Sequence, residues 1–327
     1  MKIAMLLDQQ IRPQVMDEET CRLFQSAGTV VWNQTTENDP ENARRLLEGA
    51  DIAVTSWGSP ALTAELLDAA PDLKLVLHAA GSVKSVATDE MYRRGIQIVS
   101  SACVLSSGVS ETALGLTIAA CKNFFALNQE IRQGGWSHTG ITDLYNITVG
   151  IVSMGIAGSH FAELLQNFSV HVIAYDPYVS QEQMAALGAE KVSFEELLRR
   201  SDVVSLHAPT GDATYHMINQ ETLSQMKDGA ILINTARGSL IDEAALISAL
   251  QNGKLKAACL DVTDPEPPAQ DSPLRSLPNC ILTPHLAGQA GNGLCKIGMH
   301  CYEQMQHFLA GVPMTGQVSQ AMLSRIA

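Results

Sequence analysis

One segment restricts the possible folds of this chain more than any other: residues 148–178, with the sequence TVGIVSMGIAGSHFAELLQNFSVHVIAYDPY. Apolar, strand-forming residues lead into a turn that contains Gly155 and Gly158. An amphipathic stretch of helical periodicity follows, and a second apolar strand ends at Asp176. Two neighbouring strands joined through a helix run parallel, because the crossover returns the chain to the same end of the sheet. The segment therefore predicts a parallel sheet with helices packed on it.

The glycine turn has the chemistry of a dinucleotide-binding site. The missing side chain at Gly155 lets the backbone approach a pyrophosphate, and Gly158 lets the helix pack closely on the strand. The first N–H groups of the helix, among them those of Ile156 and Ala157, lack intrahelical partners and lie at the positive end of the helix dipole. A carboxylate at Asp176 can accept hydrogen bonds from both ribose hydroxyls and would repel a 2′-phosphate. The predicted cofactor is NAD in preference to NADP.

One residue departs from the usual G-x-G-x-x-G pattern, because Ser153 stands where the first glycine is expected. A serine costs more than a glycine in a tight turn, so we expect the turn to be slightly remodelled. The alternative is an ordinary strand–helix–strand turn in which Asp176 caps the next element.

Strands and helices alternate along the whole chain, which predicts two α/β lobes. The expected strands are 2–7, 51–56, 73–79 and 96–100 in the first lobe, and 147–153, 170–175, 202–208, 230–235, 256–261 and 280–284 in the second. The expected helices are 17–26, 41–49 and 61–70, then one helical segment over 106–134, then 156–168, 194–200, 220–226, 242–252 and a last helix near 290–310. We predict a substrate domain of residues 1–103 plus 295–327, with a cofactor domain of residues 104–294 inserted in it.

Composition excludes several classes of partner. The chain has 34 acidic against 21 Lys and Arg residues and a net charge of -13, which argues against binding to nucleic acid or to an anionic membrane. Seven cysteines without C-x-x-C pairs indicate reduced thiols rather than disulfides or a metal site. The apolar run before Asp8 is too short for a signal peptide, so we expect none, and no stretch reaches about 18 consecutive apolar residues. The predicted location is the cytoplasm.

Three later strands are followed by residues that could take part in catalysis or substrate binding. These residues lie within the segments 229–246, 256–268 and 279–288. Carboxyl ends of parallel strands meet at one edge of a sheet, where such folds bind ligands. Arg237 could hold a substrate carboxylate through two hydrogen bonds, and His285 is a candidate general acid or base. Glu266 could pair with His285 and orient its ring. Taken singly, these residues could equally be a surface arginine, a structural histidine and a solvated loop carboxylate.

Together, the segments VGIVSMGIAG, YDP, INTARGSLID, LDVTDPEPP and TPHLAG resemble the D-isomer-specific 2-hydroxyacid dehydrogenase family, in family order and spacing. Weaker similarities are LHAAGSV (77–83) and SETALGL (110–116). The resemblance covers nearly the whole chain, in the manner of phosphoglycerate dehydrogenases and glyoxylate or hydroxypyruvate reductases. It implies a Rossmann-type NAD-binding domain inserted in a smaller, flavodoxin-like substrate domain, with the active site in the cleft. Family members usually form dimers through the cofactor domain.

The same resemblance implies hydride transfer between nicotinamide C4 and C2 of a 2-oxo or 2-hydroxy acid. Arg237 would bind the substrate carboxylate, His285 would protonate the forming alkoxide, and Glu266, rather than Asp264, would keep His285 protonated. Asp261 would contact the nicotinamide side of the cofactor.

The remaining expected contacts lie in backbone segments. Thr235, Ala236 and Arg237 would lie along the cofactor, and the amides of Ala80 and Gly81 would help to bind the substrate carboxylate.

Two further departures from the family pattern concern the first lobe and the end of the chain. In the loop AAGSVK (79–84), Val83 stands where many members have Asp, and Lys84 either reaches the cleft or is a solvated loop residue. The chain ends at Ala327, so we expect it to lack the C-terminal regulatory extension of many phosphoglycerate dehydrogenases.

Two other functions are weighed as alternatives. Formate dehydrogenases share the fold but carry Gln at the position of Glu266, so Glu266 argues against that function. An NAD(H)-sensing binding protein or an inactive paralogue could keep the whole Arg, Glu and His set. The identity of the 2-oxo acid and the physiological direction stay open.

Overall fold

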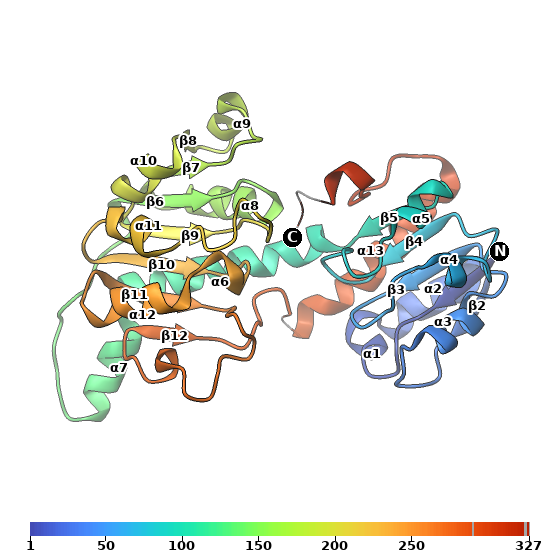
Figure 1. Ribbon diagram of the computed structural model, residues 1–327, viewed down its shortest axis with the longest axis horizontal. Coiled ribbons are helices and arrows are strands. Elements are labelled where there is room, and N and C mark those ends of the chain that lie inside the picture. Colours follow the sequence, from blue (N-terminus) through green and yellow to red (C-terminus); the bar gives the residue numbers. More distant parts are fainter. Residues whose placement is uncertain (290, 324–325, 327) are drawn as a thin grey trace. The chain divides into compact units, whose positions relative to one another are not determined.

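The computed structural model describes residues 1–289, 291–323 and 326 and divides into two compact units (Figure 1). The terminal unit comprises residues 1–105 and 289–326, and the central unit comprises residues 106–288. Both are built on parallel sheets, as predicted from the alternation of strands and helices.

The terminal unit contains a five-stranded sheet in the order β2-β1-β3-β4-β5. This order, 2-1-3-4-5, is that of flavodoxin-like folds. The strands are β1 (Lys2–Met5), β2 (Thr29–Trp32), β3 (Ile52–Thr55), β4 (Leu75–His78) and β5 (Gln97–Ser100).

Helices cover both faces of this sheet because alternate residues of each strand point to opposite sides. One face packs against α1 (Arg12–Val15), α2 (Glu18–Ala27) and α13 (Gly291–Ala310). The other packs against α3 (Pro40–Leu47), α4 (Ala64–Leu67) and α5 (Asp89–Arg93). The terminal unit therefore needs a helix from the end of the chain to cover strands from its beginning.

The central unit contains a seven-stranded sheet in the order β12-β11-β10-β9-β6-β7-β8. The strands are β6 (Tyr145–Val152), β7 (Ser169–Tyr175), β8 (Glu190–Lys191), β9 (Val203–Leu206), β10 (Ala230–Asn234), β11 (Leu255–Leu260) and β12 (Cys280–Leu282). The first strand of the unit, β6, pairs with β7 on one side and β9 on the other. This is the Rossmann order, in which the chain reverses direction across the sheet beside the first strand and ligands bind at the carboxyl ends.

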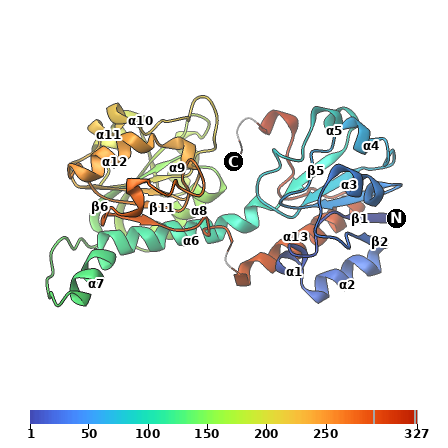
Figure 2. The same ribbon diagram turned by 60° about the horizontal axis from the view of Figure 1, so that its bottom comes forward.

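The helices of the central unit also form two layers. One core contains residues of α6 (Ala102–Cys121), α8 (Ile156–Leu165) and α9 (Gln181–Ala186), and the other contains residues of α10 (Phe194–Arg200), α11 (Gln220–Gln225) and α12 (Glu243–Gln251). The remaining helix, α7 (Phe124–Arg132), has no buried residue and stands away from the sheet in both views (Figures 1 and 2). The predicted α/β fold class is confirmed.

Two expected helices differ from those in the structure. The single helical segment expected over 106–134 is wrong: α6 ends at Cys121, and Asn123 adopts a left-handed conformation (φ 57°) before α7 begins. Asparagine tolerates this conformation better than most residues, so it can break a helix without a proline. The helix expected over 61–70 is reduced to Ala64–Leu67. Among the described residues, α6 is also the one helix that could cross a membrane by length and composition.

Candidate active site

The glycine turn joins β6 to α8 as predicted, and its two glycines differ in their surroundings. A Cβ atom at Gly158 would lie 2.1 Å from the carbonyl oxygen of Ser153, whereas one at Gly155 would meet nothing within 4 Å. Gly158 is therefore required for packing of the helix on the turn, and Gly155 leaves open space beside the backbone. The hydroxyl of Ser110 donates to the carbonyl oxygen of Ala157 (2.9 Å) and fixes the turn from α6.

Ser153 takes the left-handed conformation (φ 76°) that glycine adopts easily. Its N–H donates to the carbonyl oxygen of Tyr175 (2.8 Å), and its hydroxyl donates to Oδ2 of Asp176 (3.2 Å). The expected change at this turn therefore takes the form of backbone strain and one added hydrogen bond.

Asp176 lies directly after β7, beside the turn, and is 6% exposed. Its Oδ2 also accepts a hydrogen bond from the N–H of Met154 (2.8 Å), and its Oδ1 accepts one from the N–H of Tyr178 (2.8 Å). The carboxylate therefore links the end of β7 to the glycine turn. Capping of the next element, the alternative considered from sequence, accounts only for the hydrogen bond with Tyr178.

The surroundings of the turn fit a dinucleotide. The N–H groups of Ile156 and Ala157 belong to the first turn of α8, where N–H groups lack intrahelical partners. At the end of β10, the hydroxyl of Thr235 is buried without a hydrogen-bond partner in the described part of the chain. A buried hydroxyl without a hydrogen-bond partner favours binding of a ligand that forms the missing hydrogen bond.

His285 and Glu266 form the closest pair of the predicted catalytic residues. The ring Nδ1 of His285 lies 2.7 Å from Oε1 of Glu266, and the two side chains are 44% and 41% exposed. Glu266 lies in the loop after β11, and His285 follows β12. With Nδ1 held by the carboxylate, the other ring nitrogen, Nε2, remains to exchange a proton.

Asp261 fixes the turn that carries His285. This carboxylate, 1% exposed at the end of β11, accepts hydrogen bonds from the hydroxyl of Thr283 (2.5 Å) and from the N–H groups of Leu286 (3.0 Å) and Ala287 (2.9 Å). Its carbonyl oxygen also accepts a hydrogen bond from the N–H of His285 (2.9 Å). This role of Asp261 was not predicted from sequence, and the cofactor contact expected of it stays a prediction.

Arg237 follows β10 and is held by its own loop. Its Nη1 donates to the carbonyl oxygen of Ala236 (2.6 Å), and the side chain of Asn234, also missed from sequence, donates to the carbonyl oxygen of Arg237 (2.8 Å). Burial lowers the pKa of Arg237, and the negative charge of Glu266 acts in the opposite direction. Within the described residues the guanidinium forms no ion pair, so its remaining N–H groups are suited to an anionic ligand.

The residue after this arginine cannot carry a side chain. A Cβ atom at Gly238 would lie 2.0 Å from the carbonyl carbon of Thr263. The arginine loop and the loop that leads to Glu266 are therefore in direct backbone contact.

Ala80 and Gly81 belong to the terminal unit, where they follow β4, so the substrate contact expected of them stays a prediction. His78, at the end of β4, supports this loop: its Nδ1 lies 2.9 Å from the hydroxyl of Thr55, and burial lowers its pKa to about 4. Val83 is fully buried in the core, which accounts for an apolar residue at that position.

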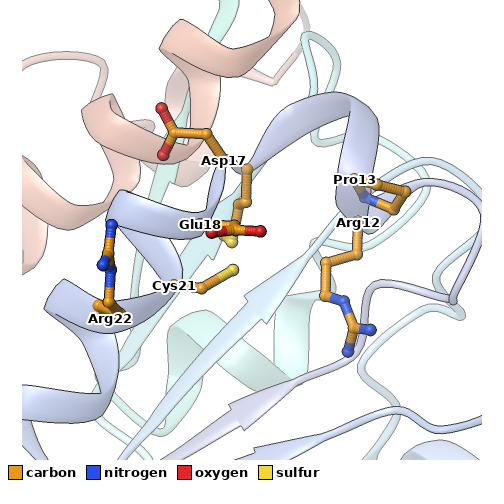
Figure 3. A pocket seen from close by; sticks show the side chains of 7 residues that line it. Arg12, Pro13, Asp17, Glu18, Cys21 and Arg22 are labelled. Carbon is orange, nitrogen blue, oxygen red and sulfur yellow. The ribbon is translucent and has the colours of Figure 1, made fainter.

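A hollow of about 390 Å³ lies elsewhere in the terminal unit, beside α1 and α2 (Figure 3). Arg12, Cys21 and Arg22 contribute to its lining. None of the predicted site residues lines it, so it is not a candidate active site. Within the described chain, no group of three or more His, Cys, Asp or Glu residues could hold a metal ion.

Comparison with known proteins gives one family match. Residues 114–287 match the family described as "D-isomer specific 2-hydroxyacid dehydrogenase, NAD binding domain". This match confirms the predicted cofactor, NAD.

Individual relatives agree with this match. The chain is similar to D-3-phosphoglycerate dehydrogenase of Archaeoglobus fulgidus (32% identity, 93% of this chain and 58% of that one). It is also similar to glyoxylate reductase of Korarchaeum cryptofilum (34% identity, 79% and 80%). The structure resembles that of a glyoxylate reductase from Paecilomyes thermophila (TM-score 0.82, 26% identity, 98% of each chain). The chain spans about half the length of the first curated relatives, which are phosphoglycerate dehydrogenases.

Proposed function

Because this chain belongs to the D-isomer-specific 2-hydroxyacid dehydrogenase family, we propose that it catalyses hydride transfer between NAD(H) and C2 of a small 2-oxo or 2-hydroxy acid of the D configuration. The observation that carries the proposal is the 2.7 Å contact between His285 Nδ1 and Glu266 Oε1, in the same unit as the guanidinium of Arg237. The names of the relatives, glyoxylate reductase and hydroxypyruvate reductase among them, support small 2-oxo acids as the substrate class.

Arg237 binds the carboxylate of the substrate in this proposal. A planar guanidinium suits a carboxylate through two charge-assisted hydrogen bonds, and partial burial strengthens the interaction. Because Asn234 and Gly238 fix the arginine loop on both sides, the guanidinium is positioned before substrate arrives.

His285 exchanges a proton with the oxygen on C2. In the direction of reduction, Nε2 donates a proton to the forming alkoxide while Glu266 stabilises the positive charge on the ring. Bound NADH supplies the hydride. Asp261 does not take part in proton transfer in this scheme, because its carboxylate already accepts three hydrogen bonds from the His285 turn.

The proposed NAD-binding residues surround the glycine turn and the end of β10. Ile156 and Ala157 would offer their N–H groups to the pyrophosphate, and Thr235 would offer its unpartnered hydroxyl. Asp176 would accept hydrogen bonds from the adenosine ribose.

Asp176→Ala should relax discrimination against NADPH. Unchanged selectivity in this variant would exclude Asp176 as the residue that distinguishes the two cofactors.

A test of the function is NADH oxidation at neutral pH with glyoxylate, hydroxypyruvate, pyruvate, branched 2-oxo acids and 3-phosphohydroxypyruvate, repeated with NADPH. We expect turnover of at least one acid and preference for NADH. NADH binding without turnover of any of these acids would favour the NAD(H)-sensing alternative.

We further propose that the protein is a cytoplasmic homodimer, assembled through the central unit. Helix α7 and the loop after it expose Phe124 (55%), Ile131 (53%) and Trp136 (80%), and exposed apolar side chains gathered in one region favour an interface. All seven cysteines are free thiols, which suits a reducing compartment.

Sedimentation velocity tests the dimer. Trp136→Asp combined with Phe124→Asp should give a monomer. Leu309→Asp, which changes an exposed apolar residue of the terminal unit, should leave the dimer intact. A wild-type protein that sediments as a monomer would contradict the proposal.

A further inference from the structure

Ser153 holds a conformation that does not suit it. A serine in the left-handed region (φ 76°) is less stable than a glycine in the same region. Its side chain forms a 3.2 Å hydrogen bond from Oγ to Asp176 Oδ2. An effect of the Ser153 side chain on a bound ligand would therefore act through Asp176.

Asp176 has few acceptor positions left for a ligand. An ionised carboxylate offers about four lone-pair sites. Three are filled, by the N–H groups of Met154 and Tyr178 and by the hydroxyl of Ser153. About one remains, whereas the two hydroxyls of an adenosine ribose need two when both donate to the same carboxylate.

The three hydrogen bonds differ in how easily they can be given up. The two N–H donors belong to the backbone and lie 2.8 Å from the carboxylate oxygens. The Ser153 hydroxyl is the most distant donor, at 3.2 Å, and rotates about a single bond. A ribose that requires a second acceptor position therefore displaces the serine first.

We propose that the Ser153 hydroxyl competes with the adenosine ribose of NAD(H) for Asp176 and thereby lowers the affinity of this protein for its cofactor. The inference rests on the proposed function only in taking NAD(H) as the ligand. The charge of Asp176 is unchanged by the competition, so the preference for NADH over NADPH is retained while binding of NADH is weakened. Displacement of one neutral donor corresponds to a change of about three- to tenfold in Kd.

The test is titration of the protein with NADH, followed by nicotinamide fluorescence. Ser153→Ala and Ser153→Gly should both lower the Kd for NADH by about three- to tenfold. Ser159→Ala removes another hydroxyl of the same turn, one that donates to the carbonyl oxygen of Met154 and does not touch Asp176, and should give no tighter binding. Reduced nicotinamide mononucleotide, which has no adenosine ribose, should bind equally to wild type and variants.

The glycine variant separates competition from strain. Ser153→Gly should also raise the melting temperature of the ligand-free protein, whereas Ser153→Ala keeps the strained backbone and should not. In an Asp176→Ala background, neither substitution should change the Kd for NADH.

Two results would contradict the competition at Asp176, and they have different consequences for the proposed function. If wild type binds NADH and Ser153→Ala binds it no more tightly, the competition does not exist and the proposed function is untouched. If folded wild-type protein binds no NADH at all, the proposed function fails, and the inference fails with it.

Discussion

Two carboxylates in the loop after β11 have opposite surroundings. Asp261 is 1% exposed and accepts three hydrogen bonds, two of them from backbone N–H groups. Glu266, five positions later in the sequence, has a side chain that is 41% exposed and contacts the ring of His285. One carboxylate therefore holds the backbone of the turn that carries His285, and the other is exposed and contacts the ring of His285 itself.

Two histidines of the central unit show the same contrast. His207 follows β9, its Nδ1 is buried without a partner in the described chain, and burial lowers its pKa to about 4. His285 follows β12 with a side chain that is 44% exposed and bound to a carboxylate. A histidine that stays neutral serves packing, whereas one that is accessible and paired with a carboxylate can exchange protons.

These residues form two groups at the same edge of the sheet. We call Asp261 and His207 the buried layer, and Glu266 and His285 the exposed rim. Substitutions in the buried layer should change stability, and substitutions in the rim should change turnover. Each of the following experiments tests one side of that division.

The largest effect is expected for His285→Ala. Loss of the proton donor should reduce kcat by about 10²- to 10⁴-fold while NADH binding and melting temperature are retained. The exposed His138 provides the control, and His138→Ala should leave kcat unchanged. A collapse of NADH binding together with turnover would assign His285 to the buried layer.

The next largest effect is a loss of folding stability at acidic pH, which we attribute to His207. Its pKa is lowered in the folded state, so between pH 6.5 and about 4 the unfolded chain binds the proton more readily. The contribution of a neutral His207 is therefore complete above pH 6.5 and is lost as the pH falls toward 4. Urea unfolding of wild type and His207→Asn should show that the wild type loses more stability, by about 2–3 kcal/mol, when the pH is lowered to about 4.5. Equal losses would place His207 with the exposed residues.

Asp261→Asn should destabilise the fold by about 2 kcal/mol, because the amide NH2 group cannot accept a hydrogen bond and the one remaining oxygen is uncharged. Glu266→Gln is the matched substitution in the rim, and the free energy of unfolding should stay within about 0.5 kcal/mol of wild type. Urea titration of both variants measures the contrast. Equal destabilisation would remove the distinction between the two carboxylates.

The smallest effect is kinetic. Glu266→Gln should lower kcat for reduction by about tenfold, because the side chain that contacts His285 Nδ1 loses its negative charge. Steady-state measurement of kcat for the variant and the wild type tests this expectation. An unchanged kcat would show that the charge of Glu266 is not needed for turnover.

Much of the fold and part of the site could be predicted from sequence. The strand–turn–helix–strand pattern around Gly155 and the pairing of Glu266 with His285 are found in the structure. Helices α5 and α9 were not predicted, because their five and six residues form less than two turns and cannot show a period of 3.6.

The roles of Asp261 and Asn234 were not predictable for a different reason. Their partners are mostly backbone N–H and carbonyl groups, which every residue carries, so no sequence signal marks them. Sequence indicates which residue types follow a strand, whereas the fold decides which of them face inward.

The order in which the chain is made gives α13 a particular importance. A ribosome synthesises β1 to β5 first and α13 only after all of residues 106–288, yet α13 covers one face of the sheet that those strands form. During translation the central unit can therefore complete its core while the first sheet still presents Leu75 and Leu77 to the solvent and to chaperones. The earliest-made part of this protein is the last to be finished.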